Sequence, residues 1–190
     1  MAATKKSVSK TTGASDDPII QDGEPVLREH AKTLTQKEIA SPEIQKLIAK
    51  MKKLLAKEKH GVGLAAPQVG SAVRLFIIAG RVFAPEIENE DEESKKVPPP
   101  PDRVFINPTI IRRSKSVSEM SEGCLSVRGL YGAVIRHDKA TIKALDENGK
   151  PFSLNGSGLL AQIFQHETDH LDGVLYIDKA TALRPEKIDR

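Results

Sequence analysis

The chain has 190 residues, 38% of them hydrophobic and 29% charged, with a formal net charge of +3. This length predicts one domain with enough chain to bury a core. No apolar run approaches the roughly 18 residues of a membrane-spanning helix, and the small charge does not by itself indicate nucleic-acid binding. A single cysteine excludes an internal disulfide framework and is typical of a reducing compartment.

The N-terminal region divides into a polar tail and a helix. Residues 1–17 are rich in Lys, Ser and Thr without apolar periodicity, which predicts a disordered tail. Residues 41–60 predict an amphipathic helix with one buried face, because apolar residues recur at helical spacing. Ser41 suits its N-cap, Pro42 its first turn, and Gly61 its end.

The glycine-rich stretch GVGLAAPQVG follows this helix at residues 61–70. Gly61 and Gly63 would let the backbone approach a substrate closely. The amide of Gln68 can donate a hydrogen bond without carrying charge. Glycine-rich loops are common, so this stretch alone indicates little.

The middle of the chain predicts strands. Residues 73–80 and 103–111 are rich in apolar β-formers, and residues 139–156 alternate around an Asn-Gly pair that favours a hairpin. Between the first two, residues 85–102 are acidic and then proline-rich, which predicts an exposed insertion loop. The order of helix, strands and a second helix predicts an α+β fold.

The second helix contains QHETDHLDG at residues 165–173. Ser157 is its expected N-cap and Gly173 its expected end. At about 100° per residue, His166 and His170 continue an apolar stripe, with Glu167 beside them. Two inward imidazoles one helical turn apart are the arrangement that a metal ion requires.

Two residues compete for the place of a third metal ligand. Glu186 lies downstream in a polar tail with no helical face to aim it inward. Cys124 lies upstream in EGCLSV, in an extended-looking segment. A thiolate with two imidazoles leaves a fourth position open for water and also admits ferrous iron, so we favour Cys124.

GVGLAAPQ, EGCLS and QHETDHLDG, in this order, resemble the three signature motifs of the peptide deformylase family. The resemblance extends to GEPVLREHA and covers roughly residues 18–178. It implies an α+β fold with small antiparallel sheets around a central metal-binding helix. It also implies a hydrolase that removes formate from N-formylmethionine, using Fe²⁺ or, as substitutes, Zn²⁺, Ni²⁺ or Co²⁺.

The resemblance also suggests roles for individual residues. Cys124, His166 and His170 would hold the metal, and Glu167 would move the proton. The Gln68 amide and the Leu125 backbone N–H would stabilise the oxyanion. Substrate contacts are expected from residues that flank the site: Gly63, Val62, Glu122, Leu159 and Ile163. Asp169 is expected to pair with Arg136.

We therefore expect a single metallohydrolase domain over residues 18–178 and a polar C-terminal tail over 179–190. Its expected partner is a formylmethionyl peptide or nascent chain, with the ribosome implied by the resemblance and no membrane contact. We expect a bacterial cytoplasmic enzyme, with organelle import as the alternative. The rival function is a metallopeptidase using His166, His170 and Glu186.

Overall fold

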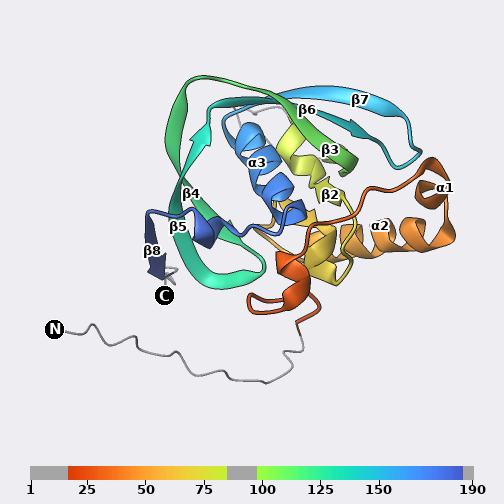
Figure 1. Cartoon of the computed structure of the whole chain (residues 1–190), viewed down its shortest axis with the longest axis horizontal. Coiled ribbons are helices and arrows are strands. Elements are labelled where there is room, and N and C mark those ends of the chain that lie inside the picture. Colours follow the sequence, from red (N-terminus) through yellow and green to blue (C-terminus); the bar gives the residue numbers. More distant parts are fainter. Residues whose placement is uncertain (1–16, 85–97, 186–190) are drawn as a thin grey trace.

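The computed structural model describes residues 17–84 and 98–185 (Figure 1). In this part of the chain, helix α3 (Leu159–Leu171) lies against a five-stranded sheet and faces a smaller three-stranded sheet. The α+β prediction is therefore confirmed. Nearly all of the expected N-terminal tail, most of the acidic insertion, and Glu186 lie outside the described residues. No described helix combines the length and apolar character needed to cross a membrane.

The remaining helices and strands vary in length from three to 14 residues. Two more α-helices precede the strands, α1 (Gln36–Ile39) and α2 (Pro42–Leu55). The strands are β1 (Gly63–Ala65), β2 (Leu75–Ile78), β3 (Arg103–Arg113), β4 (Val117–Cys124), β5 (Val127–His137), β6 (Lys139–Leu145), β7 (Pro151–Ser157) and β8 (Ala182–Pro185).

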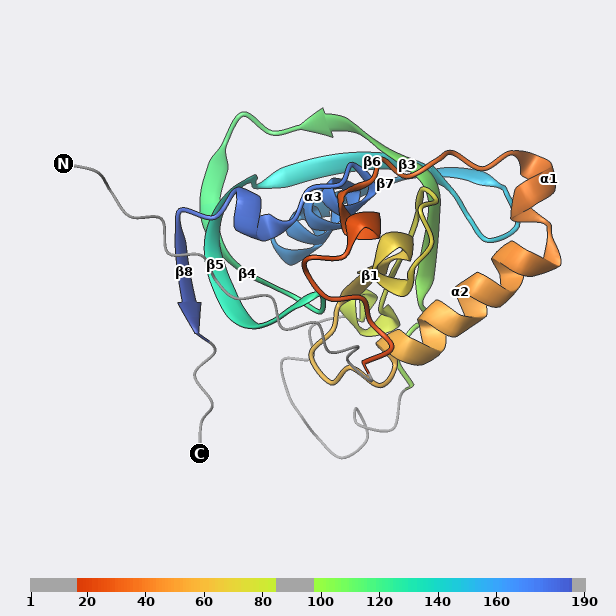
Figure 2. The ribbon, with the colours of Figure 1, turned by 60° about the horizontal axis from the view of Figure 1, so that its bottom comes forward.

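Both sheets are antiparallel. The larger has the strand order β1-β2-β3-β6-β7 and the smaller β4-β5-β8. The hairpin predicted over residues 139–156 forms β6 and β7, with Lys139 opposite Ser157. Strand β8 pairs with β5 at a point where the sequence suggested only a polar tail, and all four of its residues are exposed (Figure 2). Backbone pairing rather than burial forms this strand, so its composition gave no signal.

The core packs the inner face of the larger sheet against α3. Phe76 and Phe105 stack with ring centroids 4.8 Å apart, and Phe164 of α3 lies 5.8 Å from Phe105. All three side chains are fully buried. Full burial of each contributes roughly 1.5–3 kcal/mol of transfer free energy, so this cluster anchors α3 to the sheet.

The helix boundaries differ in part from expectation. Ser41 caps α2 as predicted, its hydroxyl accepting from the Ile44 N–H at 3.3 Å. However, α2 ends at Leu55, so Gly61 is not its stop signal. The predicted cap Ser157 instead ends β7, and Gly158 precedes α3 with a positive φ of 53°. Helix α3 therefore begins without a side-chain cap, and its first turn follows a glycine in a backbone conformation that favours glycine.

Asn107 joins the N-terminal segment to β3. Its side chain accepts from the Leu34 N–H at 2.8 Å and donates to the Leu34 carbonyl at 2.7 Å. Asn107 is the one non-glycine residue with positive φ, 49°, among the described residues. Asparagine tolerates this left-handed conformation better than alanine does. The Asn107 amide thus satisfies both backbone polar groups of Leu34, as a neighbouring strand would.

Two substitutions at position 107 separate these effects. Asn107→Gly should lower the free energy of unfolding by about 1–2 kcal/mol, the net contribution of two hydrogen bonds. Asn107→Ala should lose a further 1–2 kcal/mol or so, because alanine pays for the left-handed backbone. Urea unfolding of both variants measures the difference, and equal losses would show that the backbone conformation costs nothing here.

Candidate metal centre

Three metal-ligating side chains meet where α3 passes the end of β4. The ligand atoms of Cys124, His166 and His170 all lie within 4.8 Å of one another. The Cys124 Sγ lies 3.2 Å from the His170 Nε2. Helix α3 positions both histidines one turn apart, while β4 delivers the cysteine at its last residue. Within the described chain this is the group that could hold an ion.

The chemistry of the donor set fits a divalent transition metal. Burial would raise the pKa of the Cys124 thiol, but the neighbouring histidines lower it well below its ordinary value. A thiolate and imidazoles are ligands for zinc and ferrous iron. The His170 Nδ1 is buried without a hydrogen-bond partner among the described residues. A buried thiolate or an unpartnered buried nitrogen is costly unless its charge or its hydrogen-bonding capacity is satisfied.

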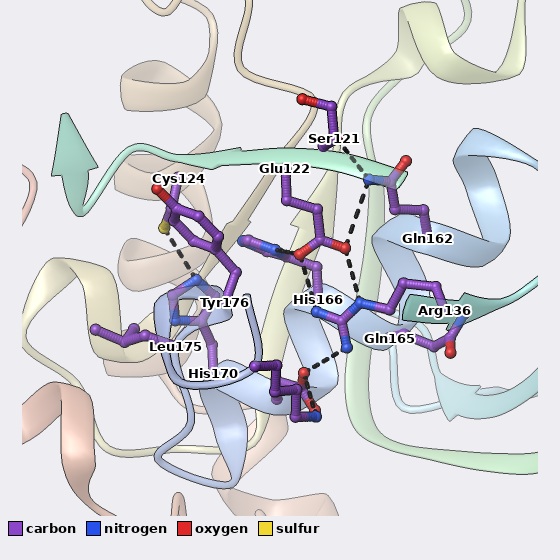
Figure 3. A network of polar contacts seen from close by, with 12 residues as sticks. Ser121, Glu122, Cys124, Arg136, Gln162, Gln165, His166, His170, Leu175 and Tyr176 are labelled. Carbon is purple, nitrogen blue, oxygen red and sulfur yellow. Dashed lines mark hydrogen bonds and ion pairs between the residues drawn. The ribbon is translucent and has the colours of Figure 1, made fainter. Parts of the chain in front are cut away.

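A chain of ion pairs runs behind His166, buried at Glu122 and Arg136 and reaching the surface at Lys179 (Figure 3). The His166 Nδ1 lies 2.9 Å from the Glu122 Oε2, which leaves Nε2 of this imidazole for a metal. Arg136 donates to both Glu122 oxygens at 2.7 and 2.9 Å and to Asp169 at 2.6 Å. Lys179 completes the chain by donating to Asp169 at 2.7 Å. The expected pairing of Asp169 with Arg136 is therefore present.

The charge of Glu122 is fixed by this chain. Burial alone would raise the pKa of its carboxyl, but hydrogen bonds from Arg136 and His166 outweigh burial and lower the pKa to about 2. Glu122 was expected among the substrate contacts, and it does line the cavity beside the cluster. Its side chain is, however, only 2% exposed and is directed at Arg136 and His166. A buried carboxylate must be paired with a charge or a hydrogen-bond donor. The partners of Glu122 are Arg136 and His166, so its carboxylate faces these side chains rather than the cavity.

Glu167 lies beside the three candidate ligands but forms no ion pair with a described residue. It is 4% exposed, and its Oε2 has no hydrogen-bond partner among the described residues. Burial raises the pKa of this carboxyl to about 7, against the opposite effect of the two histidines. A β-carbon added to Gly63 would lie 2.3 Å from the Glu167 Oε1. Only glycine at position 63 leaves room for this carboxylate.

Gln68 approaches the cluster from the short turn after β1. The Gln68 Oε1 accepts from the Ala65 N–H at 2.7 Å, which fixes the orientation of the amide. The Nε2 then donates to the Ser126 hydroxyl at 3.1 Å and lies 3.5 Å from the Cys124 Sγ. The side chain is 2% exposed. A fixed amide N–H thus lies beside the candidate ligands.

A cavity of about 680 Å³ opens beside the cluster. Each site residue predicted from the sequence lines it, except His170, which is buried behind it: Val62, Gly63, Gln68, Glu122, Cys124, Leu125, Leu159, Ile163, His166 and Glu167. Leu159 is 54% exposed and therefore lies at the rim. Gln162 lies there too and donates to the Ser121 carbonyl at 2.9 Å.

Sequence reasoning missed several residues of this cavity. Arg128 and Tyr131 also line it, and Ser126 holds the Gln68 amide. It also missed that Glu122 joins Arg136 to His166. These residues come from β4, β5 and the turn between them. Glu122 and Ser126 lie inside the EGCLS motif, but their contacts, and the proximity of Arg128 and Tyr131, depend on the pairing of two strands.

Comparisons with known proteins agree with this geometry. Residues 17–186 match the profile of the family described as polypeptide deformylase. A peptide deformylase from Christiangramia forsetii is 41% identical over 171 residues, covering 90% of this chain and 85% of that protein. A chloroplastic peptide deformylase 1A from Solanum lycopersicum is 38% identical, covering 85% of this chain and 58% of that protein.

The fold is likewise similar to solved structures. One is a class I type b peptide deformylase from Acinetobacter baumannii, with a TM-score of 0.72 and 32% identity. The match covers 85% of this chain and 97% of that one. Since the family profile spans nearly the whole described chain, and relatives above 30% identity share most of its length, the chain belongs to the polypeptide deformylase family.

Proposed function

We propose that this protein hydrolyses the formyl amide of N-formylmethionine at the start of new polypeptides, releasing formate. Family membership supports the reaction, and one structural observation supports its location at the Cys-His-His cluster. A buried Glu167 carboxylate, whose Oε2 has no hydrogen-bond partner in the described part of the chain, lies beside a Cys-His-His cluster and lines a cavity of about 680 Å³. A proton acceptor beside a candidate metal is the arrangement that metal-assisted amide hydrolysis requires.

Cys124, His166 and His170 are proposed to hold one divalent metal ion. The short distances between their ligand atoms support this set, with the His170 Nε2 3.2 Å from the Cys124 Sγ. The bound ion would supply Lewis acidity, lowering the pKa of water and polarising the formyl carbonyl. We propose Fe²⁺ as the native ion, because the thiolate is a soft ligand, with Zn²⁺, Ni²⁺ or Co²⁺ as substitutes.

Glu167 is proposed to act first as base and then as acid. Its carboxylate takes a proton from the attacking water, whose oxygen bonds to the formyl carbon. As the C–N bond breaks, Glu167 passes this proton to the leaving amine nitrogen, and formate departs. The Gln68 amide and the Leu125 N–H are proposed to donate to the developing oxyanion, where one donor contributes about 2.7–4 kcal/mol.

The peptide is proposed to bind along β1. This strand is the outer strand of its sheet in the described chain, since it pairs with β2 alone. An extended peptide can add to such an edge, beginning at Gly63. Val62, Leu159 and Ile163 line the cavity and would contact the methionine side chain. The Glu122 carboxylate is already paired with His166, so we propose that it affects the substrate site only by positioning that imidazole.

The setting of the reaction is also a proposal. Nascent chains emerge at the ribosome, so we propose that the protein works there. We propose a bacterial cytoplasmic location, on the likeness to the Christiangramia forsetii protein. The tomato relative is named chloroplastic, which keeps an organelle as the alternative.

The proposed reaction is tested by measuring formate release from a formylmethionyl peptide and cleavage of the same peptide without its formyl group. Glu167→Gln should retain the metal and lose about 10²–10⁴-fold in kcat, because it removes the proton acceptor. Cys124→Ser should lose the metal. The exposed Glu43→Gln serves as a control and should match the parent protein.

The rival metallopeptidase makes the opposite forecast. If Glu186 were the third ligand, Cys124→Ser would keep its metal and the unformylated peptide would be cleaved. Loss of metal in Glu167→Gln would instead make Glu167 a ligand and overturn the proposed roles.

Glu122→Gln tests the buried chain behind His166. The amide cannot hold an imidazole N–H as strongly as a carboxylate, so metal affinity should fall about 10–100-fold. Metal competition against a chelator measures the change. Asp172→Asn is the matched control, because it removes a charge paired with Arg74 outside the site. Unchanged metal affinity in Glu122→Gln would assign this carboxylate a purely structural role.

Gly63→Ala tests the space beside Glu167. The new β-carbon would displace the carboxylate, and a misplacement of about 1 Å can cost about 10²-fold in rate. The loss should appear in kcat at unchanged metal content. In a Glu167→Gln background the same substitution should cost little further activity, because the two residues act together. Equal losses in both backgrounds would show that Gly63 acts independently of Glu167.

A further inference from the structure

A second depression lies at one end of the larger sheet, where β3 and β7 end and β6 begins. Its volume is about 870 Å³, and none of its lining residues belongs to the cavity beside Glu167. Four cationic side chains line it: Arg112, Arg113, Lys115 and Lys139. The three strands run side by side at the top of Figure 1.

No acidic residue balances these charges within the depression. Its lining contains no Asp or Glu, and none of the five strands of the larger sheet contains one. Among the described residues, none of the four cations forms an ion pair. Asp138 precedes Lys139 in the chain, and its pKa is lowered chiefly by hydrogen bonds from Ser118 and Ser116, with a smaller contribution from the charge of Lys139.

The whole chain carries only three more basic than acidic residues, 29 against 26. Three of the four cations lie within residues 112–115, and the pairing of β3 with β6 adds Lys139, so a local excess exists that the overall composition conceals. Uncompensated cations on a concave surface focus a positive potential and attract polyanions.

Neutral polar groups are interleaved with the cations on a rigid base. Arg112 lies opposite Thr141, which lies opposite Asn155 on the next strand. The Thr141 hydroxyl donates to Asn155 at 2.8 Å, and the Ser114 hydroxyl accepts from the Lys139 N–H at 3.0 Å. The backbone ladder therefore fixes the spacing of the surface.

The side chains present favour one kind of polyanion. Guanidinium groups match phosphate geometry, and lysines add point charges. Hydroxyl and amide groups can hydrogen-bond a ribose 2′-OH. The lining contains no aromatic side chain, whereas binding of single strands depends on aromatic platforms for base stacking. We infer that this depression binds the sugar-phosphate backbone of duplex RNA without reading its sequence.

This inference goes beyond the proposed hydrolysis and does not depend on it. The probe is a fluorescent RNA duplex of about 20 base pairs, long enough for a surface that reads backbone shape. Fluorescence anisotropy with the full chain should give binding that weakens about 100-fold between about 50 and 200 mM salt, as about four neutralised phosphates require.

The variant Arg112→Gln with Lys115→Gln should lose at least about tenfold in duplex affinity, and its salt dependence should become shallower by about two phosphate contacts. The matched control is Lys50→Gln with Lys53→Gln, which removes two charges from the exposed face of α2. The control should bind the duplex like the parent. Both variants should release formate from a formylmethionyl peptide at the parent rate, because neither touches the metal centre.

Three outcomes would overturn the inference. The parent protein would show no salt-dependent duplex binding, or the control variant would lose as much affinity as the test variant. Alternatively, polyglutamate or oligouridine would displace the duplex at equal charge concentration, which would indicate an acidic protein or a single strand as the ligand. Loss of formate release with intact RNA binding would count against the proposed reaction alone.

Discussion

The ion-pair chain from Lys179 through Asp169, Arg136 and Glu122 to His166 is the interaction on which the site depends. It crosses from α3 to β4 and β5, so it ties the helix with two candidate ligands to the strand with the third. Removing one partner from a buried pair leaves an uncompensated charge and costs roughly 3–5 kcal/mol. The same contacts orient the imidazole, so stability and ligand geometry rest on one set of side chains.

Two carboxylates near the histidines have opposite environments. Glu122 is surrounded by donors and its pKa falls to about 2, whereas Glu167 is buried without an ion-pair partner among the described residues and its pKa rises to about 7. One carboxylate is held as a permanent charge, and the other is left able to exchange a proton. Environments that separate the pKa values of neighbouring acids are typical of catalytic sites. Gly63 preserves the space that the exchanging carboxylate needs.

The cavity beside Glu167 and the cationic depression lie at different places on the molecule. The cavity beside Glu167 lies between α3 and the smaller sheet, while the cationic depression lies at the end of β3, β6 and β7. Because the residues that line them do not overlap, attachment through one would leave the other open. An enzyme that meets its substrate as a growing chain would gain from such an arrangement, since holding its partner raises the effective substrate concentration.

The sequence by itself determined the α+β class, the helix that bears both histidines, the hairpin over residues 139–156, and the candidate ligand set. The helix and the hairpin depend on local periodicity and turn chemistry, which neighbouring residues fix. The ligand set was inferred from donor chemistry and from the family's motifs. Only the tertiary structure decided that Glu122 pairs with Arg136 beneath His166, that β8 adds to β5, and that Lys139 and the end of β7 join the basic run at residues 112–115. The physical reason is that strand pairing joins residues distant in sequence, and no local pattern encodes which strands become neighbours.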